Sequence, residues 1–88
     1  MSVYVDNMAA QFGRMKMCHM IADTTDELNT MADRIGVARR WIQYPGTWKE
    51  HYDICLSKKS RALDLGAVEV TMVQLVKRQM EKRKGVAL

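Results

Sequence analysis

Residues 15 to 36 constrain the fold most, because a strand pattern there runs directly into a helix pattern. The run "MKMCHMIAD", residues 15 to 23, alternates in character, so an extended chain places His19 on one face and Cys18 and Met20 on the other. Apolar side chains fall on both faces of this run. We therefore expect a strand that is covered on two sides, as central strands of α/β proteins are.

A capped amphipathic helix follows this strand without a linker. Thr24 and Glu27 have the spacing of a capping box, in which side chains satisfy the free backbone amides of a helix start. Gly36 supplies the left-handed position at which helices commonly end. Apolar residues recur between them at helical spacing, namely Leu28, Met31, Ala32 and Ile35. The sequence thus predicts one helix that packs an apolar stripe against the sheet.

Shorter signals predict the remaining elements. β-branched and aromatic runs predict strands at residues 2–6, 39–44, 50–54 and 67–70. Pro45-Gly46 separates two of these runs, which leaves a hairpin and a long loop as alternatives. A short helix is expected from a Ser57 cap to Leu65, and a final helix from a Thr71 cap. The final helix should pack against the sheet through Met72, Leu75, Val76 and Met80.

This order of elements predicts an α/β fold. We expect a small single-layer sheet, mixed or partly parallel, of three to five strands with about three helices. At 88 residues the chain has room for one small core, so residues 1–88 are predicted to be a single domain. Residues 77–88 then form a basic helix end and tail. Eight methionines and few aromatics suggest a soft core, or one completed by homo-oligomerisation.

Composition narrows the cellular setting. No apolar run reaches the roughly 18 residues of a membrane span, and no basic segment precedes an apolar block at the N-terminus. We therefore expect a cytoplasmic protein without a membrane partner. Cys18 and Cys55 are too few for a disulfide framework and are expected to be reduced and buried. Trp41 is likewise expected in the core, whereas Trp48 falls in a polar loop.

The net charge of +4 and the pI near 9.3 favour polyanionic partners. The excess is uneven, since "KRQMEKRK", residues 77 to 84, holds five basic residues and one acid. A basic helix end also suits the helix macrodipole and aids solubility, so this segment alone does not establish a polyanion site.

Acidic residues end three of the predicted strands. Asp6, Asp23 and Asp53 each close an extended run, and ligand sites of open α/β sheets lie beyond the carboxyl ends of strands. If these acids gather at one end of the sheet, they are candidates for a divalent-metal site together with His51. Each also has a structural explanation, as a helix cap or a turn residue.

Two histidines are candidates for catalysis. His51 and Asp53 are two residues apart, so both point to one face of a strand while Tyr52 points to the other. A carboxylate beside an imidazole is how general bases and metal ligands are usually oriented. After His51 and Asp53, His19 is the third candidate catalytic residue. However, a histidine on an apolar strand face is more often part of the core.

Cations are expected beside these residues. Lys58 and Lys59 fall in the first turn of the predicted short helix, where cations are disfavoured unless an anion is bound. Three arginines, Arg39, Arg40 and Arg61, add bidentate donors for phosphate oxygens, or remain solvated charges. Tyr52 or Trp48 could stack a base. Together these residues predict a phosphate-binding cleft.

The chain resembles a known family. The segments "VYVD", "GRMKMCHMIADTTDELNTMADRIGVARRW", "HYDI" and "ALDLGAVEV" are similar to the domain of unknown function 4031 family, small proteins of bacteria and tailed phages. The resemblance covers about residues 2 to 76 and implies no known activity. It implies recurrent polar positions at Asp6, His19, Asp23, Arg39, Arg40, His51, Tyr52, Asp53 and Arg61. A phage-encoded member would act in the cytoplasm of the bacterial host.

Three functions remain open from the sequence. The first is binding of a phosphorylated ligand, either a nucleotide or a nucleic-acid backbone, in the basic cleft. The second is a divalent-metal-dependent phosphoesterase or nuclease that uses the Asp and His residues. The third is a protein-interaction or homodimerisation module with exposed aromatic residues around Pro45-Gly46.

Overall fold

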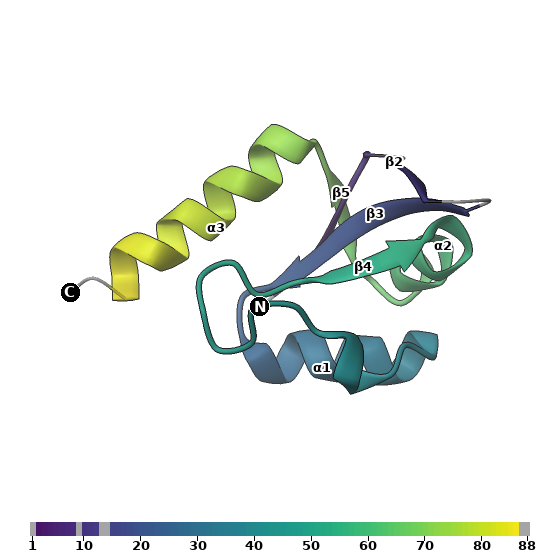
Figure 1. Ribbon diagram of the computed structural model, residues 1–88, viewed down its shortest axis with the longest axis horizontal. Helices are drawn as coiled ribbons and strands as arrows, with labels where there is room; N and C mark the ends of the chain where they lie inside the picture. The colour runs from purple at the N-terminus through teal and green to yellow at the C-terminus, as the bar shows by residue number, and fades with distance from the viewer. Residues whose placement is uncertain (1, 9, 13–14, 87–88) are drawn as a thin grey trace.

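The computed structural model describes residues 2–8, 10–12 and 15–86, which form a mixed sheet flanked by three α-helices (Figure 1). The strands are β1 (Val3–Asp6), β2 (Ala10–Phe12), β3 (Met15–Ala22), β4 (Tyr52–Cys55) and β5 (Val68–Val70). The helices are α1 (Thr25–Ile35), α2 (Leu56–Asp64) and α3 (Met72–Val86), with a 3-10 turn, η1 (Arg39–Trp41). The predicted fold class is confirmed. The last two residues of the predicted tail, 87 and 88, lie outside the described residues.

Strand β3 is the centre of the sheet. Met20 pairs with Val5 of β1 and with Tyr52 of β4, so these two antiparallel neighbours lie on opposite edges of β3. β2 pairs with the first part of β3 on the same edge as β1, and β5 adds parallel to β1. The sheet is therefore four strands wide. β2 was not predicted, because three residues are too few for an alternating pattern to be recognised.

Helix α1 forms as its sequence predicts. The Thr24 hydroxyl accepts a hydrogen bond from the Glu27 amide at 3.2 Å and donates one to the Glu27 carboxylate at 2.9 Å. Gly36 ends the helix with a φ of 82°, a conformation that costs little only for glycine. The four predicted apolar positions of α1 are all buried.

Several local predictions are wrong. Cys55, expected to be buried, is partly exposed. Residues 39–44 are not a strand, because the chain turns at η1 and only Gln43 bridges to His51. The long loop, rather than a hairpin, is thus the correct alternative between η1 and β4. Helix α2 begins at Leu56 directly after β4, with Cys55 rather than Ser57 at the cap position. Trp41 is 61% exposed instead of packed in the core.

The two faces of the sheet differ in their cover. Helices α1 and α2 pack on one face, and the main core lies there, including Val5, Met20 and Tyr52. Helix α3 crosses the opposite face and extends beyond the sheet (Figure 1). A small apolar cluster lies under it, formed by Tyr4, Ile21 and Leu75.

The predicted apolar stripe of α3 is only partly buried. Leu75 is covered, whereas Met72, Val76 and Met80 are each exposed by more than a third. The Thr71 cap is confirmed, since its hydroxyl accepts from the Gln74 amide at 3.1 Å. Along residues 2–8, 10–12 and 15–86, no helix has the length and apolarity needed to cross a membrane.

Candidate metal site on the α3 face of the sheet

A row of polar side chains crosses three strands on the face that α3 partly covers. The register pairs His19 of β3 with Asp53 of β4, and Asp6 of β1 follows Val5, which pairs with Met20. Side chains alternate along a strand, so the neighbours of this row point into the main core while the row itself points the other way. The sheet register therefore assembles Asp6, His19 and Asp53 without any loop.

Asp6 holds the His19 imidazole in a fixed orientation. Its Oδ2 atom lies 2.7 Å from His19 Nδ1, and its Oδ1 atom accepts the His19 backbone amide at 3.0 Å. Burial alone would raise the pKa of Asp6, but the hydrogen bonds and the charge of His19, together with a backbone hydrogen bond from Met8, outweigh it and hold the pKa below its usual 3.8. The hydrogen bond to Asp6 also raises the pKa of His19 above 6.5, against the effect of burial. A carboxylate only accepts, so Nδ1 of His19 carries the proton.

His51 is oriented by a main-chain carbonyl. Its Nδ1 atom lies 2.7 Å from the Lys49 carbonyl oxygen, which can only accept, so Nδ1 donates and Nε2 of the neutral ring is free. The bridge between Gln43 and His51 fixes the backbone at this point. The Gln43 side chain also donates to Asp53 Oδ2 at 2.5 Å, which leaves Oδ1 as the free oxygen of that carboxylate.

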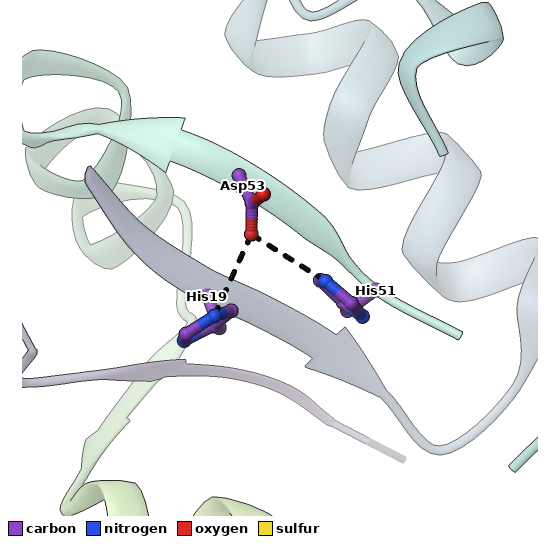
Figure 2. Close-up of side chains that lie close together, drawn as sticks. All are labelled: His19, His51 and Asp53. Atoms are coloured by element: carbon purple, nitrogen blue, oxygen red, sulfur yellow. Dashed lines mark ion pairs between the residues drawn. The ribbon is translucent and has the colours of Figure 1, made fainter. Parts of the chain in front are cut away.

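The free atoms of His19, His51 and Asp53 converge, as Figure 2 shows. Asp53 Oδ1 lies 3.6 Å from His19 Nε2 and 3.4 Å from His51 Nε2, and one donor atom from each residue lies within 4.8 Å of the others. Among the residues that the structure describes, Asp53 Oδ1 is buried without a hydrogen-bond partner. Ligands about 2.05 Å from a tetrahedral metal are separated by about 3.3 Å, close to these two distances.

Three electron-pair donors that face one another repel unless a cation lies between them. When both rings are neutral, the tautomers set by Asp6 and by the Lys49 carbonyl place lone pairs on both Nε2 atoms. A proton on one imidazole can relieve one contact, whereas a metal ion would relieve all three. A histidine whose second nitrogen donates to a carboxylate or a carbonyl is also the usual arrangement in metal sites.

An apolar pocket of about 270 Å³ opens beside the two histidines. Its walls come from the loop before β4 and from α3, and they include Tyr44, Trp48, Lys49, Met72, Leu75, Val76 and Gln79. Contacts from α3 to the rest of the chain hold this wall. Gln79 donates to the Lys49 carbonyl at 3.3 Å, the Arg83 guanidinium lies 5.3 Å from the Trp48 ring, and Lys82 donates to the Ala22 carbonyl.

Asp23 lies away from this row. Its backbone amide donates to the Ser2 carbonyl at 3.0 Å and its carboxylate accepts the Ser2 amide at 2.8 Å, which places it at the start of β1. Asp6 is at the other end of that strand. The expectation that all three acids gather at one end is therefore wrong for Asp23, because β1 and β3 are antiparallel. Asp6 joins the group as the partner of His19, since both of its carboxylate oxygens already accept from that residue.

The predicted basic residues do not converge on the histidines. The Arg39 guanidinium binds Asp33 at 2.8 and 3.1 Å, and Arg61 Nε donates to the Arg34 carbonyl at 3.0 Å. The Lys58 ammonium lies over Gly36, where an added Cβ would come within 3.0 Å of it. These three cations therefore lie at the carboxyl end of α1, where the exposed carbonyl groups attract positive charge.

The other predicted ligand-binding residues also contact groups of the chain itself. Lys59 pairs with Glu69 at 2.7 Å, and the Arg40 guanidinium lies 5.2 Å from the Trp41 ring. Tyr52 is fully buried on the opposite face, where its hydroxyl donates to Asn29 at 2.6 Å, so it is not available to stack a base. The pocket beside the two histidines is lined by none of the residues predicted to bind phosphate, namely Arg39, Arg40, Tyr52, Lys58, Lys59 and Arg61.

Sequence reasoning missed the residues that orient and enclose the site. Gln43, the Lys49 carbonyl and the α3 wall have no motif, and only the structure brings them together. Trp48 was singled out from the sequence and does line the pocket.

Residues 3–82 match the model of a family described as protein of unknown function (DUF4031). This confirms the resemblance found in the sequence. The comparisons with the curated proteins and with the solved structures found no match.

Proposed function

We propose that this chain, which belongs to the DUF4031 family, binds a divalent transition metal through His19, His51 and Asp53 and hydrolyses a phosphate ester there. The observation that carries the proposal is the convergence of three free donor atoms on one point. Asp53 Oδ1 lies 3.6 Å from His19 Nε2 and 3.4 Å from His51 Nε2. The orienting hydrogen bonds to Asp6 and to the Lys49 carbonyl support the same assignment.

The donor set favours a particular group of metals. Two imidazoles and one carboxylate suit zinc, iron or manganese, whereas magnesium and calcium prefer sites made of oxygen atoms. Three protein ligands leave at least one coordination position for water or substrate. A metal bound there would supply a hydroxide at neutral pH and polarise the ester.

The residues around the metal ligands have defined roles in this proposal. Asp6 keeps the proton on His19 Nδ1, and Gln43 turns Asp53 so that Oδ1 faces the two histidines. The pocket gives a substrate access to His19 and His51 from one side. Lys49 lines this pocket and supplies a cation for a phosphate group. The overall positive charge of the chain also favours an anionic substrate in the cytoplasm.

Binding of a phosphorylated ligand without catalysis receives less support. The arginines and lysines expected to form its cleft contact the end of α1, Glu69 or Trp41 instead. A metal site needs none of them.

A metal titration tests the proposal directly. Calorimetry of the purified, EDTA-treated protein with Zn²⁺ should show one site per chain. At a metal concentration of about 100 times Kd, binding adds about 2.7 kcal/mol to the free energy of unfolding. This raises the Tm by roughly 10 to 20 °C for a domain of this size.

Variants locate the site. His51→Ala should weaken Zn²⁺ binding by more than about 100-fold, because it removes a ligand rather than a supporting residue. Asp23→Ala is the matched control, since it removes a carboxylate at the opposite end of β1 and should leave the affinity unchanged. Equal losses in both variants, or no Zn²⁺ binding by the unaltered protein, would contradict the proposal. Metal-dependent release of p-nitrophenol from p-nitrophenyl phosphate, absent in His51→Ala, tests the hydrolytic step.

A further inference from the structure

We infer that the substrate carries an apolar group of the size of one aromatic ring, which binds between α3 and the loop before β4 while its anionic group meets His19 and His51. This inference rests on the proposed metal site and adds the chemical class of the molecule that uses it. It concerns the pocket of about 270 Å³ whose lining includes both histidines.

The pocket explains apolar side chains that the fold leaves uncovered. Met72 is 45% exposed and Val76 is 42% exposed, although both belong to the stripe that α3 turns toward the sheet. Both line the pocket together with the buried Leu75. A ring placed there would remove these surfaces from water at about 25 cal/mol per Å². The remaining exposure of α3, at Val73 and Met80, does not border the pocket.

The opposite wall presents flat aromatic surfaces. Tyr44 and Trp48 come from the loop, and the Lys49 ammonium lies 5.7 and 5.2 Å from their ring centres. This wall is held by a turn in which the Thr47 amide donates to the Tyr44 carbonyl at 3.2 Å, and by Arg83, whose guanidinium lies 5.3 Å from the Trp48 ring centre. A planar apolar group therefore meets an aromatic wall on one side and aliphatic side chains on the other.

The volume and the charges exclude a long polyanion as the favoured ligand. A cavity of about 150 Å³ holds benzene, so about 270 Å³ accommodates a ring with a short polar arm. A nucleic-acid backbone needs a track of cations. Among the described residues that line this pocket, Lys49 is the one lysine or arginine, while Arg39, Lys58 and Arg61 lie at the end of α1.

The test compares two non-hydrolysable anions that differ in the apolar group. Zn²⁺-loaded protein is titrated by calorimetry with phenylphosphonate and with methylphosphonate. Burial of a phenyl group should make phenylphosphonate bind about 10- to 100-fold more tightly. Repeating both titrations in EDTA should abolish them, because the anionic group then has no metal.

Neighbouring valines of α3 provide the matched variants. Val76→Gln places a polar group in the pocket wall and should remove most of the preference for the phenyl compound, without changing methylphosphonate affinity. Val73→Gln makes the same change at an exposed residue of α3 that does not line the pocket, and it should keep the preference. Met72→Gln is a second pocket variant, and a Tm measurement confirms that each variant is folded.

Each failure has its own meaning. If Zn²⁺ binds but the two phosphonates bind equally, or if Val73→Gln acts like Val76→Gln, the inferred pocket is wrong and the metal site stands. Tighter binding of a single-stranded oligonucleotide than of phenylphosphonate, insensitive to Val76→Gln, also overturns the inference. A titration with Zn²⁺ alone that shows no binding overturns the proposed function, and the inference with it.

Discussion

The two faces of the central sheet differ in what they bury, although the same strands supply both. The face under α1 and α2 carries the larger apolar core, with Met20, Ile54 and Tyr52 fully covered. The face under α3 carries three buried apolar residues and the polar row that ends in the His19, His51 and Asp53 group. Because side chains alternate along β3 and β4, each strand sends apolar residues to the core on one face and site residues to the other face. One helix layer holds the fold while the other face remains open to a ligand.

The sharpest test of this division is the stability of the two helix layers. Leu28→Ala removes a fully buried side chain of α1 from the main core and should lower the free energy of unfolding by about 2 to 5 kcal/mol. Val76→Ala on α3 removes a side chain that is 42% exposed and should cost about 0.5 kcal/mol or less. Urea denaturation followed by circular dichroism measures both.

The outcome separates a supporting face from an open one. Similar losses in the two variants would mean that α3 is as much a part of the core as α1. Guanidinium or urea m-values should stay unchanged in both, since neither variant changes the surface exposed on unfolding by much.

The next effect concerns Asp6, the β1 residue that orients His19 of β3. Asp6→Asn keeps the shape of the side chain but removes the carboxylate that orients His19, and it should weaken Zn²⁺ binding by about 10- to 100-fold. The pKa of His19 in the metal-free protein should fall, because the hydrogen bond to Asp6 is the largest cause of its increase above 6.5. Calorimetry measures the first change, and an NMR titration of the imidazole measures the second.

A matched acid shows whether the effect belongs to this face. Asp33→Asn removes a carboxylate that pairs with Arg39 beside α1, so Zn²⁺ affinity and the His19 pKa should both stay unchanged. If Asp6→Asn lowers the Tm but changes neither metal affinity nor the His19 pKa, Asp6 has only a structural role.

Much of this arrangement was predictable from local sequence patterns. Alternation in residues 50–54 predicts that His51 and Asp53 share the face opposite Tyr52, and that arrangement is confirmed. His19 was expected more often in the core, but it lies half-buried beside Asp53 on the α3 face. The capping box and Gly36 define α1 because both act within a few residues. These signals are local, so the sequence alone contains them.

What could not be predicted depends on strand direction and on long-range partners. Asp23 follows β3 just as Asp6 ends β1, and only the antiparallel pairing of these strands sends the two acids to opposite ends. Lys58 appeared to need an anion at its helix start, but the carboxyl end of α1 lies beside it. This contact at Gly36 depends on how the two helices pack, so no sequence spacing encodes it.

A smaller effect distinguishes the lysine of the open face from the lysine beside α1. Lys49→Ala should weaken phenylphosphonate binding to the Zn²⁺ protein about fivefold, because the ammonium borders the pocket at a partly solvated position. Lys58→Ala should leave the affinity unchanged, since its ammonium lies over Gly36. Calorimetry at low and high salt measures both variants. If Lys58→Ala lowers phenylphosphonate affinity more than Lys49→Ala does, the anion binds at the start of α2 instead.

The smallest effect compares one thiol from each face. Cys18 is buried in the main core, and burial raises its pKa to about 11, so it should not react with iodoacetamide at pH 7.5 in the folded protein. Cys55 lies two residues after Asp53, and the hydrogen bond with Ser57 at 3.2 Å lowers its pKa below 9.0. A lower pKa leaves more thiolate at pH 7.5, so Cys55 should be the thiol that is labelled.

Ser57→Ala should slow labelling of Cys55 about two- to threefold, as expected for the loss of one weak hydrogen bond, and leave Cys18 unreactive. Mass spectrometry of the digested protein measures each site, and a denatured sample gives the reference rate. Labelling of Cys18 at a rate similar to that of Cys55 would show that the α1 face opens as readily as the α3 face. That result would contradict the proposed difference between a closed core under α1 and an open site under α3.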